Sequence, residues 1–254
     1  MIKEGDYALF FDERGKKRLI KIRREGRFQS DLGYIEYKDV IGRYYGERFE
    51  TSKNRFIWVL KPSLYDFIMK IKRRTQIVYP KDIGYIIVKL GVKHNSKILE
   101  IGTGSGALTT AFAWILSKEG LIDTFDKRCE FIELAKENVS KVNPEAKVNF
   151  HCIDALKADF KNEYYDIAFV DIDSPWNVVD RVYNALKPSG RVGFVLPTYN
   201  QVEKLLPYLD NKFIDLEGVE VFKRELQLKK GKIRPEFRMI GYTAILITGV
   251  KTII

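Results

Sequence analysis

The sequence predicts an α/β protein whose main part is a Rossmann-like, doubly wound parallel sheet, preceded by a small β-rich domain. From Ser96 onward, short apolar runs of strand type alternate with runs of helical spacing, which indicates a parallel sheet covered by helices. A glycine-rich turn joins the first of these strands to the first helix. The chain ends in two strand-type runs without a helix between them, which predicts a closing antiparallel pair at the sheet edge.

The β-rich domain is expected over residues 1–61, and the main domain over residues 62–254. Turns at Gly5-Asp6, Arg14-Gly15 and Glu25-Gly26 separate the early strand-type runs. Lys61-Pro62 marks the boundary. The runs that predict strands lie at residues 8–11, 19–22 and 56–60.

The main domain is expected to open with helices at residues 63–72 and 83–90, where apolar side chains recur at helical spacing. Strands are then predicted at residues 98–101, 121–125, 147–152, 167–170 and 192–196. The helices between and after them are predicted at residues 108–116, 128–142, 177–185 and 202–209. The closing pair is placed at residues 219–228 and 242–250, an ending that is typical of Rossmann-like methyltransferases and disfavours a dehydrogenase.

Composition indicates a globular protein in the cytoplasm. The 254 residues are 45% hydrophobic and 31% charged, and scarce Met and Cys beside plentiful Lys, Glu and Ile lean towards a thermophilic source. We expect no membrane span, because no apolar run approaches about 18 residues, and the N-terminus is no signal peptide. Cys129 and Cys152 are expected to be buried or incidental thiols. His94 and His151 are too isolated for a zinc site, so no metal is expected.

The positive charge is concentrated in the first third of the chain. Residues 1–82 hold 20 Lys and Arg against 12 Asp and Glu, whereas the other 172 residues carry a balance of only +2. Aromatic residues lie among these charges, at Tyr34, Tyr37, Tyr44, Tyr45 and Phe49. Basic and aromatic side chains together favour a nucleic-acid partner. A solvated basic surface without a partner is the alternative.

Residues 97–107 indicate a binding site for an adenosine-containing cofactor. Gly102, Gly104 and Gly106 allow a tight turn and a close ligand approach, and the following helix start favours polar or anionic groups. Asp126 lies 20 residues beyond Gly106, where such folds place a carboxylate for ribose hydroxyls. The glycine spacing also satisfies a loose NAD pattern. Glu100 and the third glycine fit S-adenosylmethionine better.

Three aspartates follow predicted strands and are candidates for binding or chemistry. Asp126 suits the ribose, or alternatively caps the next helix. Asp154 suits the adenine amino group, or caps a loop. Asp171 opens the segment Asp171-Ile172-Asp173-Ser174-Pro175-Trp176 after an apolar strand, where open α/β sheets bind ligands. A carboxylate there can accept a hydrogen bond from a base amine. Trp176 either walls the pocket or packs in the core.

Taken together, these motifs resemble the tRNA adenine-N1 methyltransferases that modify the T-loop at position 58, and in archaea also 57. The resemblance covers nearly the whole chain and is of the archaeal type. Two positions depart from the family pattern: Gly241-Tyr242-Thr243-Ala244 stands for the usual Gly-His-Thr-Gly, and Asp126 stands for the usual Glu. The residues that carry the resemblance are Gln76-Ile77-Val78-Tyr79-Pro80-Lys81-Asp82, Glu100 to Gly106, Asp171 with Pro175-Trp176, Leu186-Lys187-Pro188 with Gly190, Pro197 with Asn200-Gln201, and Arg234-Pro235.

The resemblance implies methyl transfer from S-adenosylmethionine to N1 of an unpaired or flipped T-loop adenine. It assigns catalysis to Asp171, with Tyr79 helping to place the base, and it implies a homotetramer. The cofactor-binding set that it implies is Gln76, Glu100, Gly102, Thr103, Gly104, Ser105, Gly106, Ala107, Asp126, Lys127, Asp154, Ala155 and Asp171.

Three other interpretations remain at this point. A methyltransferase for a small molecule or a protein would keep the cofactor loop without needing the basic first third. A non-catalytic tRNA-binding subunit would carry degenerate cofactor residues, whereas Gly102, Gly104, Gly106, Asp126 and Asp171 are all present. A nicotinamide dehydrogenase is disfavoured by the closing strand pair. The sequence leaves open which adenosine is modified and whether Asp171 or Asp173 is the essential carboxylate.

Overall fold

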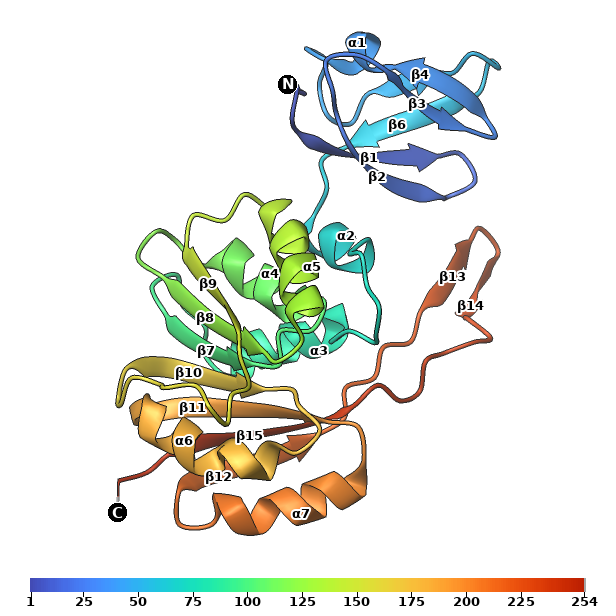
Figure 1. The fold of residues 1–254 in the computed structure, drawn as a ribbon. Helices are drawn as coiled ribbons and strands as arrows, with labels where there is room; N and C mark the ends of the chain where they lie inside the picture. Colours follow the sequence, from blue (N-terminus) through green and yellow to red (C-terminus); the bar gives the residue numbers. More distant parts are fainter. Residues whose placement is uncertain (254) are drawn as a thin grey trace. The chain divides into compact units, whose positions relative to one another are not determined.

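The computed structural model describes residues 1–253 (Figure 1). Its contacts divide the chain into two compact units, Met1–Ile71 and Lys72–Ile254. Among the described residues, no helix is both long and apolar enough to cross a membrane.

The first unit is built on a four-stranded antiparallel sheet with strand order β2-β1-β6-β5. The predicted strands are present as β1 (Tyr7–Asp12), β2 (Lys17–Lys21) and β6 (Phe56–Leu60), which alternate buried and accessible residues or pair with a strand that does. Its core includes Phe10, Ile22, Phe28 and Ile57. Short elements that the sequence pattern missed are β3 (Arg27–Ser30), β4 (Gly33–Glu36), α1 (Tyr37–Val40) and β5 (Arg48–Glu50).

Helix α2 (Leu64–Met69) goes with the first unit. Ser63 caps its start, because the hydroxyl accepts from the Asp66 N–H while the Asp66 carboxylate accepts from the Ser63 N–H. Asp66 also pairs with Lys17 on β2 at 3.7 Å. The predicted domain boundary after Lys61 lies before this helix, and it stays a prediction.

The second unit contains the predicted Rossmann-like sheet, with strand order β12-β15-β11-β10-β7-β8-β9. The pairs from β11 to β9 are parallel, and β15 runs antiparallel to both β11 and β12. The strands are β7 (Lys97–Ile101), β8 (Leu121–Asp126), β9 (Lys147–Cys152), β10 (Tyr165–Val170), β11 (Leu186–Leu196), β12 (Phe213–Val219) and β15 (Ile245–Lys251).

Helices cover both faces of this sheet (Figure 1). One face carries α3 (Pro80–Lys89), α4 (Ala107–Ile115) and α5 (Cys129–Ser140). The other carries α6 (Val179–Ala185), preceded by the 3-10 turn η1 (Pro175–Val178), and α7 (Tyr199–Leu209). The central strands are buried on both sides, as parallel strands in such folds are. For example, β10 is buried at every position from Ile167 to Val170.

The closing strand pair is confirmed in kind, but one of its strands was placed wrongly. The partner of β15 is β12, at Phe213–Val219, and not the run at residues 219–228. Asp215 and Glu217 lie on this edge strand and made it look polar. Residues 226–229 belong instead to a separate hairpin, in which β13 (Leu226–Lys229) pairs with β14 (Lys232–Pro235). We call residues 220–244 the arm.

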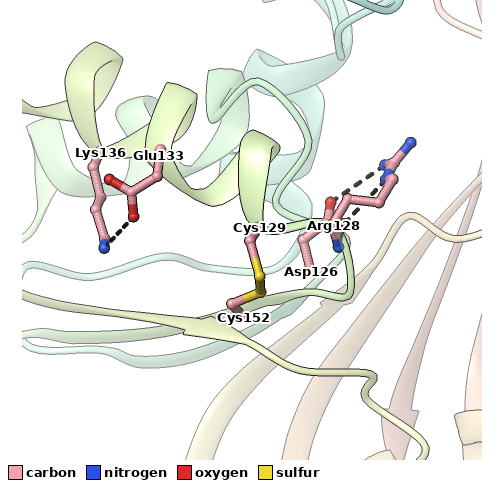
Figure 2. Close-up of a disulfide and its surroundings, with 6 residues drawn as sticks. All are labelled: Asp126, Arg128, Cys129, Glu133, Lys136 and Cys152. Carbon is pink, nitrogen blue, oxygen red and sulfur yellow. Dashed lines mark hydrogen bonds and ion pairs between the residues drawn. A yellow bond between two sulfur atoms is a disulfide. The ribbon is translucent and has the colours of Figure 1, made fainter.

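Cys129 and Cys152 form a disulfide (Figure 2). The prediction of buried or incidental thiols was therefore wrong, because both residues are exposed and paired. The connection from β8 through α5 to β9 brings the first residue of the helix beside the last residue of the strand. Their Cα atoms lie 5.1 Å apart, a separation that a disulfide spans. Only the tertiary fold creates this contact, and the spacing of 23 residues gives no sign of it.

Candidate active site at the carboxyl ends of the central strands

The site forms where the strand order reverses. Strands β7 and β10 are neighbours, with Ile101 paired to Val170, so the segments after them start side by side. The Asp171 N–H donates to the Ile101 carbonyl at 2.8 Å. A Cβ on Gly102 would fall on the Asp171 carbonyl oxygen. Open α/β sheets bind ligands at this switch point, and here the glycine turn and the aspartate segment are packed backbone against backbone.

Glu100 holds the glycine turn from below. It is buried, and its carboxylate accepts hydrogen bonds of 2.6 Å from the hydroxyls of Thr109 and Thr124. Because Thr124 donates its proton to Glu100, the hydroxyl of Thr103 must be the donor in the 2.6 Å contact between the two threonines. A chain of hydroxyl groups therefore connects Glu100 to the turn.

Asp126 also faces the glycine turn, from the end of β8. Its Oδ2 accepts from the Gly104 N–H at 3.1 Å, and its Oδ1 accepts from the Arg128 N–H at 3.0 Å. The Arg128 guanidinium lies on the same carboxylate, with Nε 3.1 Å from Oδ1. Asp126 is thus not the cap of α5, since the residue before that helix is Arg128, which makes no side-chain capping bond.

Two hollows open above these strand ends. The larger, of about 320 Å³, lies over β8 and β9, and the smaller, of about 30 Å³, lies over the glycine turn. Both are lined by Gly102 and Asp171, so they meet at these two residues.

Most of the predicted binding residues line one of the hollows. Gln76, Glu100, Thr103, Gly104, Ser105 and Ala107 line the smaller one. Asp126, Lys127, Asp154 and Ala155 line the larger one. Two predicted residues line neither. Gly106 precedes α4 at φ +77°, and a Cβ there would lie 2.9 Å from that of Ala135. Tyr79 lies in front of α3, and its hydroxyl donates to the Gln76 amide oxygen at 3.1 Å.

The smaller hollow has an unsatisfied polar atom, the Ser105 hydroxyl. This oxygen is buried and has no hydrogen-bond partner within the described part of the chain. A buried hydroxyl without a partner is costly, and a polar ligand group at the helix start would satisfy it. Gly104 has open space where its Cβ would be. The residues therefore fit a cofactor with polar groups at this end.

The carboxylates at this site raise one another's pKa. Withdrawal from bulk water raises the pKa of Asp171 to about 6, and the charges of Asp126 and Asp173 raise it further, against Arg128. The Asp171 side chain nevertheless remains accessible from the hollows. Burial raises the pKa of Glu100 to about 7, against the two threonine hydroxyls. A cationic ligand group would be favoured beside such a cluster.

Several residues of the site had no sequence signal. Arg128, Leu156, Ser174 and Asn177 line the larger hollow. Asn138 on α5 is buried, and its amide donates to the carbonyl oxygens of Ser105 and Lys72. Arg128 was detectable only as the neighbour of Asp126, and Asn138 lies 33 residues from the turn it supports.

Some aromatic candidates have structural roles. Trp176 packs against the core, with the Lys204 ammonium 4.0 Å from the ring centroid. In the first unit, Phe49 is a core residue and the Tyr45 hydroxyl donates to Asp6. Tyr34 and Tyr44 are exposed, and the Arg27 guanidinium lies 4.5 Å from the Tyr34 ring centroid. No group of three or more His, Cys, Asp or Glu side chains is arranged for a metal within residues 1–253.

The sheet order and the glycine turn define the class of this protein as a Rossmann-like methyltransferase. The chain belongs to the family described as tRNA methyltransferase complex GCD14 subunit, whose sequence model matches residues 55–240. Residues 1–47 match the TrmI-like N-terminal family. The resemblance drawn from the motifs is thereby confirmed.

Relatives agree over nearly the full length. The tRNA (adenine(57)-N(1)/adenine(58)-N(1))-methyltransferase TrmI of Methanocaldococcus jannaschii is 32% identical, over 94% of this chain and 93% of the relative. The structure of tRNA (m1A58) methyltransferase TrmI from Aquifex aeolicus is 36% identical, with a TM-score of 0.87 over 100% of this chain and 99% of the other. A SAM-dependent O-methyltransferase from Thermotoga maritima is 34% identical, with a TM-score of 0.92 over 99% and 95%.

Proposed function

We propose that this protein transfers a methyl group from S-adenosylmethionine to N1 of a T-loop adenosine of tRNA, at position 58. The observation that carries the proposal is the place of Asp171, an accessible carboxylate at the junction of the two hollows. The relative from M. jannaschii is named for positions 57 and 58, so position 57 is a second candidate target.

The two hollows suit the two ends of the cofactor. Asp126 and Asp154 would bind the ribose and the adenine in the larger hollow, beside Lys127 and Ala155. The smaller hollow, with the Ser105 hydroxyl and Gln76, would take the amino-acid end. When bound, S-adenosylmethionine supplies a methyl group activated by its sulfonium. The shared residues Gly102 and Asp171 then lie at the transferable methyl.

Asp171 orients the target base and stabilises charge. The N1 atom of neutral adenine carries a lone pair and no proton, so the reaction requires no strong general base. The ionised carboxylate of Asp171 accepts a hydrogen bond from the adenine 6-amino group and opposes the positive charge that develops on the ring. Tyr79 and its partner Gln76 help to place the base beside the smaller hollow.

The first unit supplies a surface for the tRNA backbone. Its exposed arginines include Arg23, Arg24 and Arg27, near the exposed ring of Tyr34. Phosphate binding by such groups recognises shape and charge, and exposed aromatic rings stack on unpaired bases. tRNA substrates make the cytoplasm the expected compartment. A disulfide is unusual there, except in intracellular proteins of hyperthermophiles.

The arm supports self-association, which we propose to give a homotetramer. Its exposed apolar residues are Phe222, Leu226, Leu228, Ile233, Phe237, Met239 and Ile240. Apolar patches of this kind mark protein interfaces. Leu228 and Ile233 face each other across the hairpin, so the double variant Leu228→Glu/Ile233→Lys keeps a favourable cross-strand pair. We expect it to lower the mass in solution, measured by light scattering, whereas Lys232→Gln leaves the mass unchanged.

A second candidate is methyl transfer to another acceptor, which the T. maritima relative described as an O-methyltransferase favours. The deciding experiment incubates the protein with labelled S-adenosylmethionine and an unmodified tRNA transcript, and maps the label by nucleotide. Label at N1 of a T-loop adenine supports the proposal. No label on RNA, with S-adenosylhomocysteine still bound, points to the other acceptor.

The same assay tests the role of Asp171. We expect Asp171→Ala to abolish transfer while S-adenosylhomocysteine still binds, because the carboxylate acts on the base. The matched variant Asp173→Ala removes the neighbouring carboxylate. If Asp173→Ala is inactive and Asp171→Ala is active, the essential carboxylate is Asp173.

A further inference from the structure

The disulfide joins the two loops that line the larger hollow. Cys129 directly follows Asp126-Lys127-Arg128, and Cys152 directly precedes Ile153-Asp154-Ala155. Figure 2 shows the sulfur bridge next to the Asp126–Arg128 pair. The crosslink therefore lies at the base of the proposed adenosine-binding hollow.

The bridge acts where the sheet pairing ends. The last paired residues of β8 and β9 are Asp126 and Cys152. Beyond this pair, the Ile153 N–H donates to the Asp126 carbonyl at 3.1 Å. The disulfide adds a covalent connection between the two loops at this edge, and so limits how far they can separate.

The positions of Arg128 and Cys129 are coupled through the backbone. The Arg128 N–H and guanidinium both donate to the Asp126 carboxylate, while its guanidinium carbon lies 4.0 Å from the Phe131 ring centroid. A ribose that binds Asp126 has to share or displace the guanidinium. A fixed backbone at residue 129 keeps Asp126 in place during this exchange.

We propose that Cys129 and Cys152 form a positioning pair for the cofactor, so that the disulfide form binds S-adenosylmethionine more tightly than the dithiol form. The inference rests on the proposed function. Both cysteines are exposed, so a soluble dithiol reaches them. Reduction transfers two electrons and two protons from the dithiol: the bond between the sulfurs breaks, two protein thiols form, and the reductant becomes a disulfide.

The size of the effect follows from the population of the binding geometry. If the freed loops hold that geometry for about one tenth of the time, the apparent Kd rises about tenfold. tRNA affinity is expected to change little, because the proposed backbone contacts lie in the first unit.

The experiment measures the Kd of S-adenosylhomocysteine by calorimetry on the full chain, oxidised and after dithiothreitol, with thiol titration to confirm each state. The double variant Cys129→Ser/Cys152→Ser is measured in both buffers. Glu133→Gln is the matched control, since it removes the exposed ion pair with Lys136 on the same helix (Figure 2) and keeps the disulfide. We expect a tenfold weaker Kd for the reduced protein and the double variant, no response of that variant to dithiothreitol, and an unchanged Kd for Glu133→Gln.

Equal Kd values for the oxidised and reduced protein overturn the inference, even if reduction lowers the Tm, because the bridge then only stabilises the fold. In that case, normal methyl transfer to tRNA leaves the proposed function intact. If neither form binds S-adenosylhomocysteine, the cofactor assignment fails, and with it both proposals.

Discussion

At the scale of single residues, Asp171 combines accessibility with a raised pKa. Its pKa lies at about 6 because it is withdrawn from bulk water near Asp126 and Asp173. The proposed reaction uses its ionised form, so kcat/KM should rise about tenfold per pH unit below pH 6 and level off above it. The positive charge of Arg128 lowers this pKa, so Arg128→Met should move the midpoint to higher pH. A flat profile between pH 5 and 8 would contradict the role of Asp171.

Two glycines of the turn should separate folding from binding. An added Cβ at Gly102 falls on the Asp171 backbone and is strained at φ +95°, so Gly102→Ala should lower the free energy of unfolding by about 3 kcal/mol. At Gly104 the Cβ meets open space at φ +52°, so Gly104→Ala should cost about 1 kcal/mol.

The methyl group of Gly104→Ala would instead enter the smaller hollow, whose volume is about that of one methyl group. S-adenosylhomocysteine binding should therefore weaken more than tenfold while the Tm stays near that of the wild type. Denaturation and calorimetry on both variants check the contrast. Two variants with equal loss of stability and equal loss of binding would refute it.

At the scale of elements, the sequence predicted those that are long and periodic or carry a fixed turn. The parallel strands, the helices between them and the glycine turn were predictable because each has a local pattern. The strands of three or four residues, such as β5, are too short for any period. The edge strand β12 alternates charged residues and was missed for that reason.

Contacts between distant segments account for the rest of the differences. The disulfide depends on the crossover between β8 and β9, and Arg128 enters the site only because β8 ends at Asp126. Most of the binding residues implied by the family motifs do line the two hollows. Their order along each hollow, and the meeting point at Asp171, come from the sheet topology.

The start of α3 is tied to both ends of the arm by a buried ion pair. The Lys81 ammonium donates to the Asp82 carboxylate at 2.7 Å, to the Val221 carbonyl and to the Thr243 hydroxyl. Thr243 in turn donates to Asp82 at 3.0 Å. All three protons of the ammonium are therefore used, and the Asp82 side chain is only 2% exposed. This pair holds the segment that contains Tyr79 against the two roots of the arm.

Removing one member of this pair should be far more damaging than removing a hydroxyl. Lys81→Met leaves the Asp82 charge buried and unpaired, so the free energy of unfolding should fall by about 3–5 kcal/mol. Thr243→Val should cost about 1 kcal/mol. In urea denaturation, the double variant Lys81→Met/Asp82→Asn should lose less than the sum of its single changes. An unchanged denaturation midpoint for Lys81→Met would show that the network is not needed.

At the scale of the whole molecule, the two units divide the work by charge. The first 82 residues carry most of the net positive charge, and the carboxylates of the site lie in the second unit. An anionic RNA is attracted to the first unit, while the cluster of Asp126, Asp171 and Asp173 favours a cationic group and repels phosphate. The two substrates should therefore respond differently to salt.

The last prediction follows from this separation. The affinity for tRNA should fall steeply with salt because bound phosphates release counterions, whereas the Kd of S-adenosylhomocysteine should stay nearly constant. Arg23→Gln/Arg24→Gln in the first unit should reduce the slope of log K against log salt by about 1 per lost phosphate contact. Lys118→Gln removes one charge from an exposed position of the second unit and should leave the slope unchanged. If only Lys118→Gln reduces the slope, tRNA is bound by the second unit, and the basic first unit is a solvated surface.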